Sequence, residues 1–301
     1  MAREIRHKGE QMTVAAVARP SSLRDVAWAT WILLALGGLM VLYVFTQPGG
    51  LALGTFSFVA PVFFAAAVIY AAPMDRRFVW GAVLIALAPA VWFIAGVLPD
   101  AWFAVVPGDW KNATPLLMEL GDLARPIAQV FGYIGLGLFA VALGGVRTIL
   151  SVAIIGAGLL LGALRVVEFL GNPIESMPID ITVRSIVFPL LYAGGWAFVF
   201  AAALESRRIL TIVGTGLLFA DVVINVVLGL WPSYDPDGTV LLIYSVPVLA
   251  GWILLIAAAL RGELNAPARP TSPGQRFAPA DRAATVDSGT HDIRRESQPG
   301  R

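Results

Sequence analysis

The sequence predicts an all-α integral membrane protein, built as a bundle of eight transmembrane helices. Three observations predict this class. Apolar residues make up 58% of the 301 residues and charged residues only 14%, whereas soluble domains carry about 25% charged residues. The apolar residues gather in runs of roughly 20, the number of helical residues that crosses a hydrocarbon core about 30 Å thick. Most of the charged residues lie in the connections between these runs and in the two ends of the chain.

The eight runs cover residues 26–46, 55–73, 78–98, 115–145, 148–169, 184–204, 209–231 and 240–260, and the apolar part of the fourth is 126–145. They are apolar on every face, whereas strands of a membrane barrel alternate over about 10 residues, so we expect helices. Ser22 followed by Asp25 is typical of a capping box before the first run. Pro115 after Thr114 marks a helix start, and the segment from Pro115 to Pro126 fits either an interfacial helix or an extension of the fourth span.

Polar segments flank the apolar region. Residues 1–25 are polar, and the apolar run after them is too long for a secretory signal. Residues 261–301 are dominated by Pro, Arg, Ser, Asp and Gly, and they have too little apolar surface to offset the entropy of ordering. The predicted organisation is a cytoplasmic segment (1–25), a transmembrane domain (26–260) and a disordered cytoplasmic tail (261–301).

The basic residues predict the orientation, because Lys and Arg concentrate in cytoplasmic loops. With a cytoplasmic N-terminus, 17 of the 21 Lys and Arg residues lie on the cytoplasmic side, and the other side carries 4 of them with nine acids. An even number of spans then places both termini in the cytoplasm. Arginine supplies 19 of the 21 basic residues in this alanine-rich chain, which we interpret as bacterial, so we expect the bacterial inner membrane.

The second and sixth runs resemble each other. Residues 57–65 and 185–193 share serine, valine, proline and alanine at corresponding positions, and an arginine pair follows each run, at 76–77 and at 207–208. This resemblance predicts two parallel repeats of four spans, 26–145 and 148–260, as in some transporters. The alternative is coincidence, because these residue types are common here and arginines are expected at cytoplasmic helix ends in any case.

Asp221 is the one ionisable residue deep inside a predicted span, and Asn225 follows one helical turn later. Because a charge at mid-membrane costs several kcal/mol, an acid at this depth indicates a site for a solute, a cation or a proton. The alternative is a neutral acid that shares its proton with Asn225 or with a backbone carbonyl.

Four secondary candidates lie in other spans. Gln129 and Tyr133 are one turn apart in the fourth span, where they either face a site or hold helices together. Arg165 and Glu168 lie at the outer end of the fifth span, where they either line a vestibule of paired charges or form an ordinary interfacial ion pair.

The residues that the spans lack exclude several chemistries. The only histidines, His7 and His291, lie in the polar segments, no lysine lies in any span, and the chain has no cysteine. The spans therefore lack the usual ligands for haem and zinc, and they lack the thiol and the lysine amine that thiol and Schiff-base chemistry require. We expect no cofactor and no nucleic-acid partner; the expected partners are the lipid bilayer and a small molecule.

The predicted function is that of a carrier or permease for a small solute or lipid, with Asp221 at the midplane. Two alternatives stay open. A non-catalytic scaffold, assembly factor or sensor partner fits the sparse polar content, and a lipid-acting enzyme at the outer face would use Glu119, Asp122 or Glu168.

Overall fold

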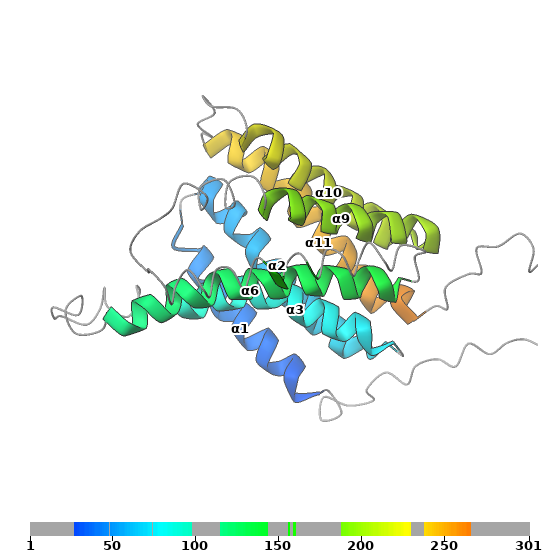
Figure 1. The fold of residues 1–301 in the computed structure, drawn as a ribbon, viewed down its shortest axis with the longest axis horizontal. Coiled ribbons are helices and arrows are strands. Elements are labelled where there is room, and N and C mark those ends of the chain that lie inside the picture. The colour runs from blue at the N-terminus through cyan, green and yellow to red at the C-terminus, as the bar shows by residue number, and fades with distance from the viewer. Residues whose placement is uncertain are drawn as a thin grey trace, which may run out of the picture. The chain divides into compact units, whose positions relative to one another are not determined.

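A computed structural model of the chain describes residues 27–47, 49–73, 75–97, 115–143, 156, 159–160, 188–229 and 238–265. All regular structure within these ranges is helical, as Figure 1 shows. The described residues belong to one compact unit, Met1–Ala268. The predicted N-terminal segment, the loop 98–114 and the tail beyond residue 265 lie outside the described residues.

Seven of the eight predicted spans coincide with helices of the described part, and the fifth, 148–169, lies almost wholly outside it. The long helices are α1 (Trp28–Val44), α2 (Gly49–Ala71), α3 (Arg76–Trp92), α6 (Pro115–Ala142), α9 (Phe188–Ser206), α10 (Ile209–Gly229) and α11 (Gly238–Leu260). A π-helical turn, η2 (Phe93–Val97), follows α3, and a 3₁₀ turn, η4 (Glu263–Asn265), follows α11. Within the described residues, two stretches, Ala52–Ala71 and Arg76–Ala95, are long and apolar enough to cross a membrane.

Two helix ends differ from the prediction, and one alternative is decided. α1 begins at Trp28 with Ala27 as its N-cap and no capping side chain, so the predicted capping box at Ser22 does not start this helix. α2 begins at Gly49, six residues earlier than predicted. The segment after Pro115 continues without a break to Ala142, so it is an extension of the fourth span and not a separate interfacial helix.

The connections α2–α3 and α9–α10 are built alike. The residue that follows each helix, Ala72 after α2 and Arg207 after α9, has a left-handed backbone with φ of 44° and 54°. A left-handed residue lets the chain turn away while its N–H still bonds to the last helical turn. A carboxylate then caps the next helix in each case: Asp75 accepts from the backbone N–H of Arg77 at 2.9 Å, and Glu263 accepts from that of Thr211 at 3.2 Å.

Glycines bring two helix pairs into close contact. A Cβ atom at Gly135 of α6 would lie 2.7 Å from the carbonyl oxygen of Gly81 of α3. A Cβ atom at Gly214 of α10 would lie 2.9 Å from the carbonyl oxygen of Gly251 of α11. Because no larger side chain fits at such distances, the backbones pack directly on each other, as small residues allow in membrane helices.

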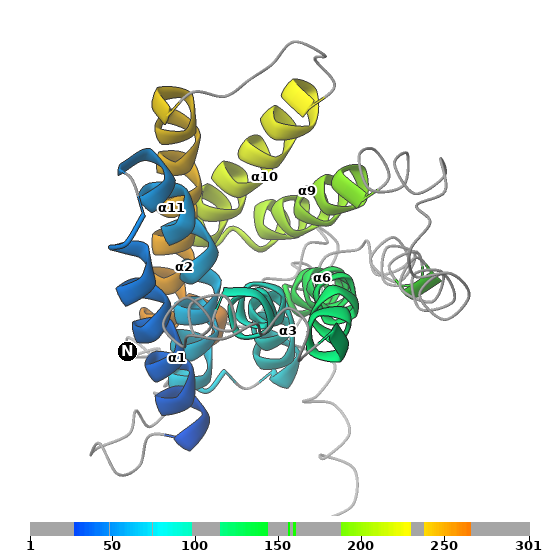
Figure 2. The same cartoon turned by 90° about the vertical axis from the view of Figure 1, so that its left-hand side faces the viewer.

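The two predicted repeats are interleaved. Within the first repeat α3 packs on α6 and on α2, and within the second repeat the equivalent helix α10 packs on α11 and on α9. Between the repeats, the second helix of each packs on the fourth helix of the other, so that α2 lies on α11 and α9 lies on α6. Figure 2 shows α3 beside α6 and α2 beside α11. Each major contact made by the described long helices of one repeat therefore has an equivalent contact in the other repeat. The one exception is the contact of α1 on α2. The counterpart of that contact would involve the fifth span, which is not described.

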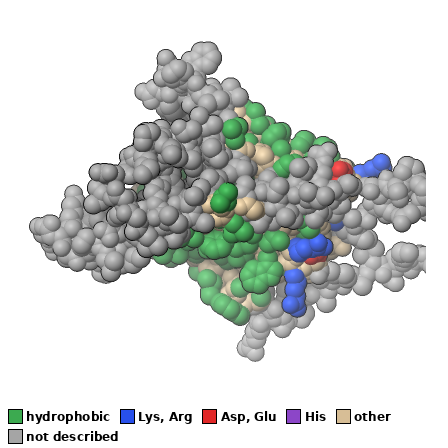
Figure 3. All heavy atoms as spheres, viewed as in Figure 1, with side chains coloured by type: hydrophobic (Ala, Val, Ile, Leu, Met, Phe, Trp, Pro, Cys, Tyr) green, Lys and Arg blue, Asp and Glu red, His purple; other side chains and the backbone are tan. Residues whose placement is uncertain are grey.

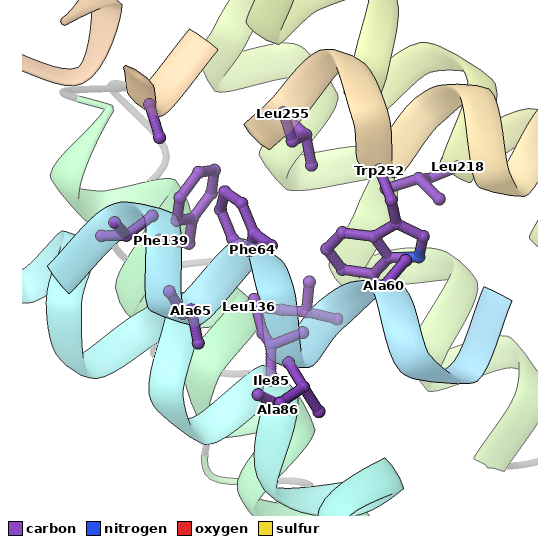
Figure 4. Close-up of a cluster of buried hydrophobic side chains, with 14 of the residues drawn as sticks. Ala60, Phe64, Ala65, Ile85, Ala86, Leu136, Phe139, Leu218, Trp252 and Leu255 are labelled. Atoms are coloured by element: carbon purple, nitrogen blue, oxygen red, sulfur yellow. The ribbon is translucent and has the colours of Figure 1, made fainter. Parts of the chain in front are cut away.

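The core lies where these pairs meet. α2 supplies Phe64, α6 supplies Leu136 and Phe139, and α11 supplies Trp252, all at most 3% exposed. Figure 4 shows the Phe64 and Phe139 rings close together with Trp252 beyond them. Burying a side chain of this size stabilises a fold by about 2 kcal/mol in water. Between helices in lipid, such side chains stabilise the fold through van der Waals packing instead.

Candidate functional site around Asp221

Asp221 lies in the second half of α10 and is half-buried. Two residues on its helical face, Gly214 and Leu218, are buried against Gly251 of α11. This side of α10 therefore faces into the bundle, as the sequence pattern predicted.

α9 packs on α10, and Tyr192 of α9 interacts electrostatically with the Asp221 carboxylate. The Tyr192 ring meets Tyr133 of α6 edge to face, with centroids 5.9 Å apart, and meets Trp196 one turn along α9 at 6.3 Å. Tyr192 therefore interacts both with the Asp221 carboxylate and with aromatic side chains of α6 and α9.

These rings belong to a longer series of aromatic contacts that crosses α6, α9, α11, α2 and α3. Neighbouring ring centroids are 5.3–6.3 Å apart, and nearly all pairs are edge to face, the arrangement that aromatic quadrupoles favour. In order, the rings are Tyr133, Tyr192, Trp196, Trp252, Phe64, Phe139 and Phe78. We call this set the aromatic chain.

The far end of the aromatic chain meets a buried charge. The Arg208 guanidinium carbon lies 5.5 Å from the centre of the Phe78 ring, within cation–π range, and the side chain is 7% exposed. Burial lowers the pKa of Arg208, and the nearby charge of Glu263 opposes this effect. Glu263 also accepts hydrogen bonds from the N–H groups of Leu210 and Thr211 and from the Thr211 hydroxyl, at 3.1–3.3 Å.

A carboxylate beside a phenol can exchange a proton with a bound group, and it can hold a cation against the electron-rich faces of neighbouring rings. The described residues include no group of three or more His, Asp or Glu side chains that could hold a metal ion.

The sequence-predicted candidates have different outcomes. Tyr133 contacts the Tyr192 ring, and Tyr192 interacts electrostatically with Asp221. Asn225 and Gln129 lie in α10 and α6, but their side chains are outside the described residues. Arg165 and Glu168 are outside them altogether, and only the helical backbone is described at Glu119 and Asp122.

Tyr192, Trp196 and Glu263 were missed by sequence reasoning. Tyr192 and Trp196 are four residues apart in a predicted span, a spacing that puts them on one helical face, so an aromatic stripe could have been noticed. Glu263 gave no such signal, because its partners on α10 are 52 and 53 residues away.

Comparison of the chain with protein families, with curated proteins and with solved structures finds no match.

Proposed function

We propose that the protein is an eight-span integral membrane protein of the bacterial inner membrane, with both termini in the cytoplasm. Three further helices support this topology: α9, α10 and α11 are 19, 21 and 23 residues long and consist mostly of apolar residues. At 1.5 Å per residue, 20 residues span about 30 Å, the thickness of the hydrocarbon core.

The surface of the helices supports the same proposal. In the two stretches that are long and apolar enough to cross a membrane, 50% and 44% of the residues are buried inside the protein, so the other half are partly or fully exposed. α1 exposes a broad apolar face, and Figure 3 shows hydrophobic side chains covering much of the visible described surface. Contiguous apolar surface of this extent is rare on soluble monomers, whereas a bilayer would cover it.

We further propose that the protein is a carrier for a small solute or lipid, in which Asp221 takes up and releases a proton or binds a cationic group. The observation that carries the proposal is a half-buried acid on the side of α10 that faces into the bundle. This acid interacts electrostatically with Tyr192, whose ring contacts Tyr133 of the other predicted repeat. The paired helix contacts described above support two parallel repeats, an arrangement in which the substrate site lies between the repeats near mid-membrane.

Asp221→Asn tests the proposal in proteoliposomes that hold the purified protein. Vesicles with an imposed pH gradient would be incubated with a small-molecule and lipid extract of bacterial cells, and mass spectrometry would identify what accumulates inside. We expect the wild type to accumulate at least one compound and Asp221→Asn to lose at least nine-tenths of this uptake.

Asp75→Asn is the matched control, because it makes the same chemical change at a connection outside the helices. It should keep uptake near the wild-type level, and both variants should unfold within a few degrees of the wild type. Accumulation of no compound by folded wild type, or equal uptake by Asp221→Asn, would overturn the carrier proposal. Such a result would favour a scaffold or assembly factor.

A further inference from the structure

Five helix ends meet at a single junction. Asn265, after α11, donates from its side-chain nitrogen to the carbonyl oxygen of Ala71 at the end of α2, at 3.5 Å. Glu263 caps the start of α10, and Arg208, in the α9–α10 connection, lies over Phe78 at the start of α3. The ends of α2, α9 and α11 and the starts of α3 and α10 are therefore held together.

Five arginines surround this junction, and we call them the arginine junction: Arg76, Arg77, Arg207, Arg208 and Arg261. Figure 3 shows basic side chains toward this end of the described helices. Three acids lie at the same helix ends: Asp75, Glu205 and Glu263. The junction therefore carries more positive than negative charge, by two formal charges.

The acids leave three of the arginines exposed. Asp75 is paired with Arg77 at 2.7 Å, and Glu263 is engaged by the start of α10 beside the buried Arg208. The other three, Arg76, Arg207 and Arg261, are exposed, and within the described part of the chain they form no ion pair. Their charges are thus available to a phosphate group.

Exposed apolar side chains lie next to each of these three arginines. Trp80 is one turn after Arg76 on the same face of α3, Ile209 lies two residues after Arg207, and Leu260 precedes Arg261; their exposed fractions are 60%, 72% and 43%. A soluble phosphate compound has no apolar chain that would contact these side chains. A phospholipid needs both parts, because its headgroup is anionic and its acyl chains are apolar.

We propose that the arginine junction binds the headgroup of an anionic phospholipid of the cytoplasmic leaflet, with its acyl chains along Trp80, Ile209 and Leu260. The inference rests on the proposed membrane topology, which places this end of the helices at the cytoplasmic surface. Basic pockets between transmembrane helices on this side are a recurrent way to bind such lipids.

Native mass spectrometry of the full-length protein in detergent would test the site, with dioleoyl phosphatidylglycerol titrated against dioleoyl phosphatidylcholine. The test variant is Arg76→Gln/Arg261→Gln. The control, Arg269→Gln/Arg276→Gln, removes the same charge from the predicted tail. At about 1 kcal/mol per basic residue near a membrane surface, the test variant should bind phosphatidylglycerol on the order of 30-fold more weakly. The control should stay within about twofold of the wild type, and thermal unfolding should show that both variants fold.

Three outcomes would overturn the proposal. Equal binding of the two lipids would show that the headgroup charge is not recognised. Equal losses in the two variants would show that net charge, and not the junction, attracts the lipid. Full competition by glycerophosphoglycerol, which has no acyl chains, would indicate a soluble anion. Because none of these measurements depends on transport, a failure here is distinct from a failure of Asp221→Asn to stop uptake.

Discussion

Asp75 both starts α3 and pairs with a charge. Its carboxylate accepts from the backbone N–H of Arg77 at 2.9 Å and from the Arg77 guanidinium at 2.7 Å. A side-chain acceptor at the N-cap satisfies a backbone donor that the helix cannot, and removing it costs about 1 kcal/mol. The ion pair itself is exposed and adds little.

We predict that Asp75→Ala lowers the free energy of unfolding in detergent by about 1 kcal/mol, and that Asp75→Asn, which keeps an acceptor, lowers it by less. Hydrogen bonds from the Arg77 side chain lower the pKa of Asp75, although partial burial opposes them. A lowered pKa means stability that is fully present above about pH 4 and is lost as the pH falls further. Wild type should therefore lose its advantage over Asp75→Asn below about pH 4; an unchanged difference down to pH 2 would contradict this.

Glu263 caps α10 from a distant part of the chain. We predict that Glu263→Ala lowers the free energy of unfolding of the purified protein by about 1–2 kcal/mol, because the backbone donors of Leu210 and Thr211 lose their acceptor. Glu263→Gln keeps one acceptor oxygen and should restore at least half of the loss. Equal effects of the two substitutions would mean that the charge near Arg208, and not the cap, is what matters.

A candidate functional residue can be predicted from the sequence when the evidence for it lies within a single segment of the chain. Asp221 is identified because it is an acid inside an apolar run. Its electrostatic interaction with Tyr192 depends on how α9 and α10 pack. The burial of Arg208 beside the exposed Arg207 depends on where Phe78 of another helix lies. Neither arrangement is visible from composition or spacing.

Among the helices, glycine spacing decides how closely the pairs approach. Gly135 and Gly132 are both in α6, yet a Cβ atom at Gly135 would meet backbone atoms of α3, whereas one at Gly132 would meet nothing within 4 Å. Alanine normally stabilises a helix by about 1 kcal/mol relative to glycine. The two positions therefore separate helix propensity from helix contact.

We predict that Gly135→Ala destabilises the protein by about 1–3 kcal/mol, because α3 and α6 must move apart. Gly132→Ala should be neutral or stabilise it by up to about 1 kcal/mol. Thermal unfolding of the two variants in the same detergent would measure the difference. Equal behaviour would show that the close contact at Gly81 does not hold the pair together.

Apolar runs predict where helices lie but not how they end. The runs located the seven described helices because each is apolar over its length. The widened turn η2, which follows Pro89 closely, was missed; proline removes a backbone donor, but the sequence does not show how the neighbouring carbonyls rearrange. The unbroken course of α6 was left open, because its first turns carry Glu119 and Asp122, which fit either alternative.

For the whole molecule, the proposed topology makes a direct prediction. Because the wild-type chain has no cysteine, single cysteines can be introduced after Gln47, Trp110, Glu175 and Asp235 and labelled specifically. A membrane-impermeant maleimide should label these sites in intact spheroplasts, and a cysteine at Met74, between α2 and α3, should react only after lysis. The reversed pattern, or labelling of all five sites, would contradict the proposed orientation.

The interleaved contacts also affect how the protein is made. α2 packs extensively on α11, yet about 170 residues separate the end of α2 from the start of α11. At a synthesis rate of 5–20 residues per second, the partner of α2 emerges about 10–30 s later. In the proposed membrane topology, the nascent chain presents the α2 side of its future core to lipid or to an insertion factor during this interval. A ribosome that stalls before residue 238 would therefore leave a chain unable to close its core, and such chains should be recognised early by membrane proteases.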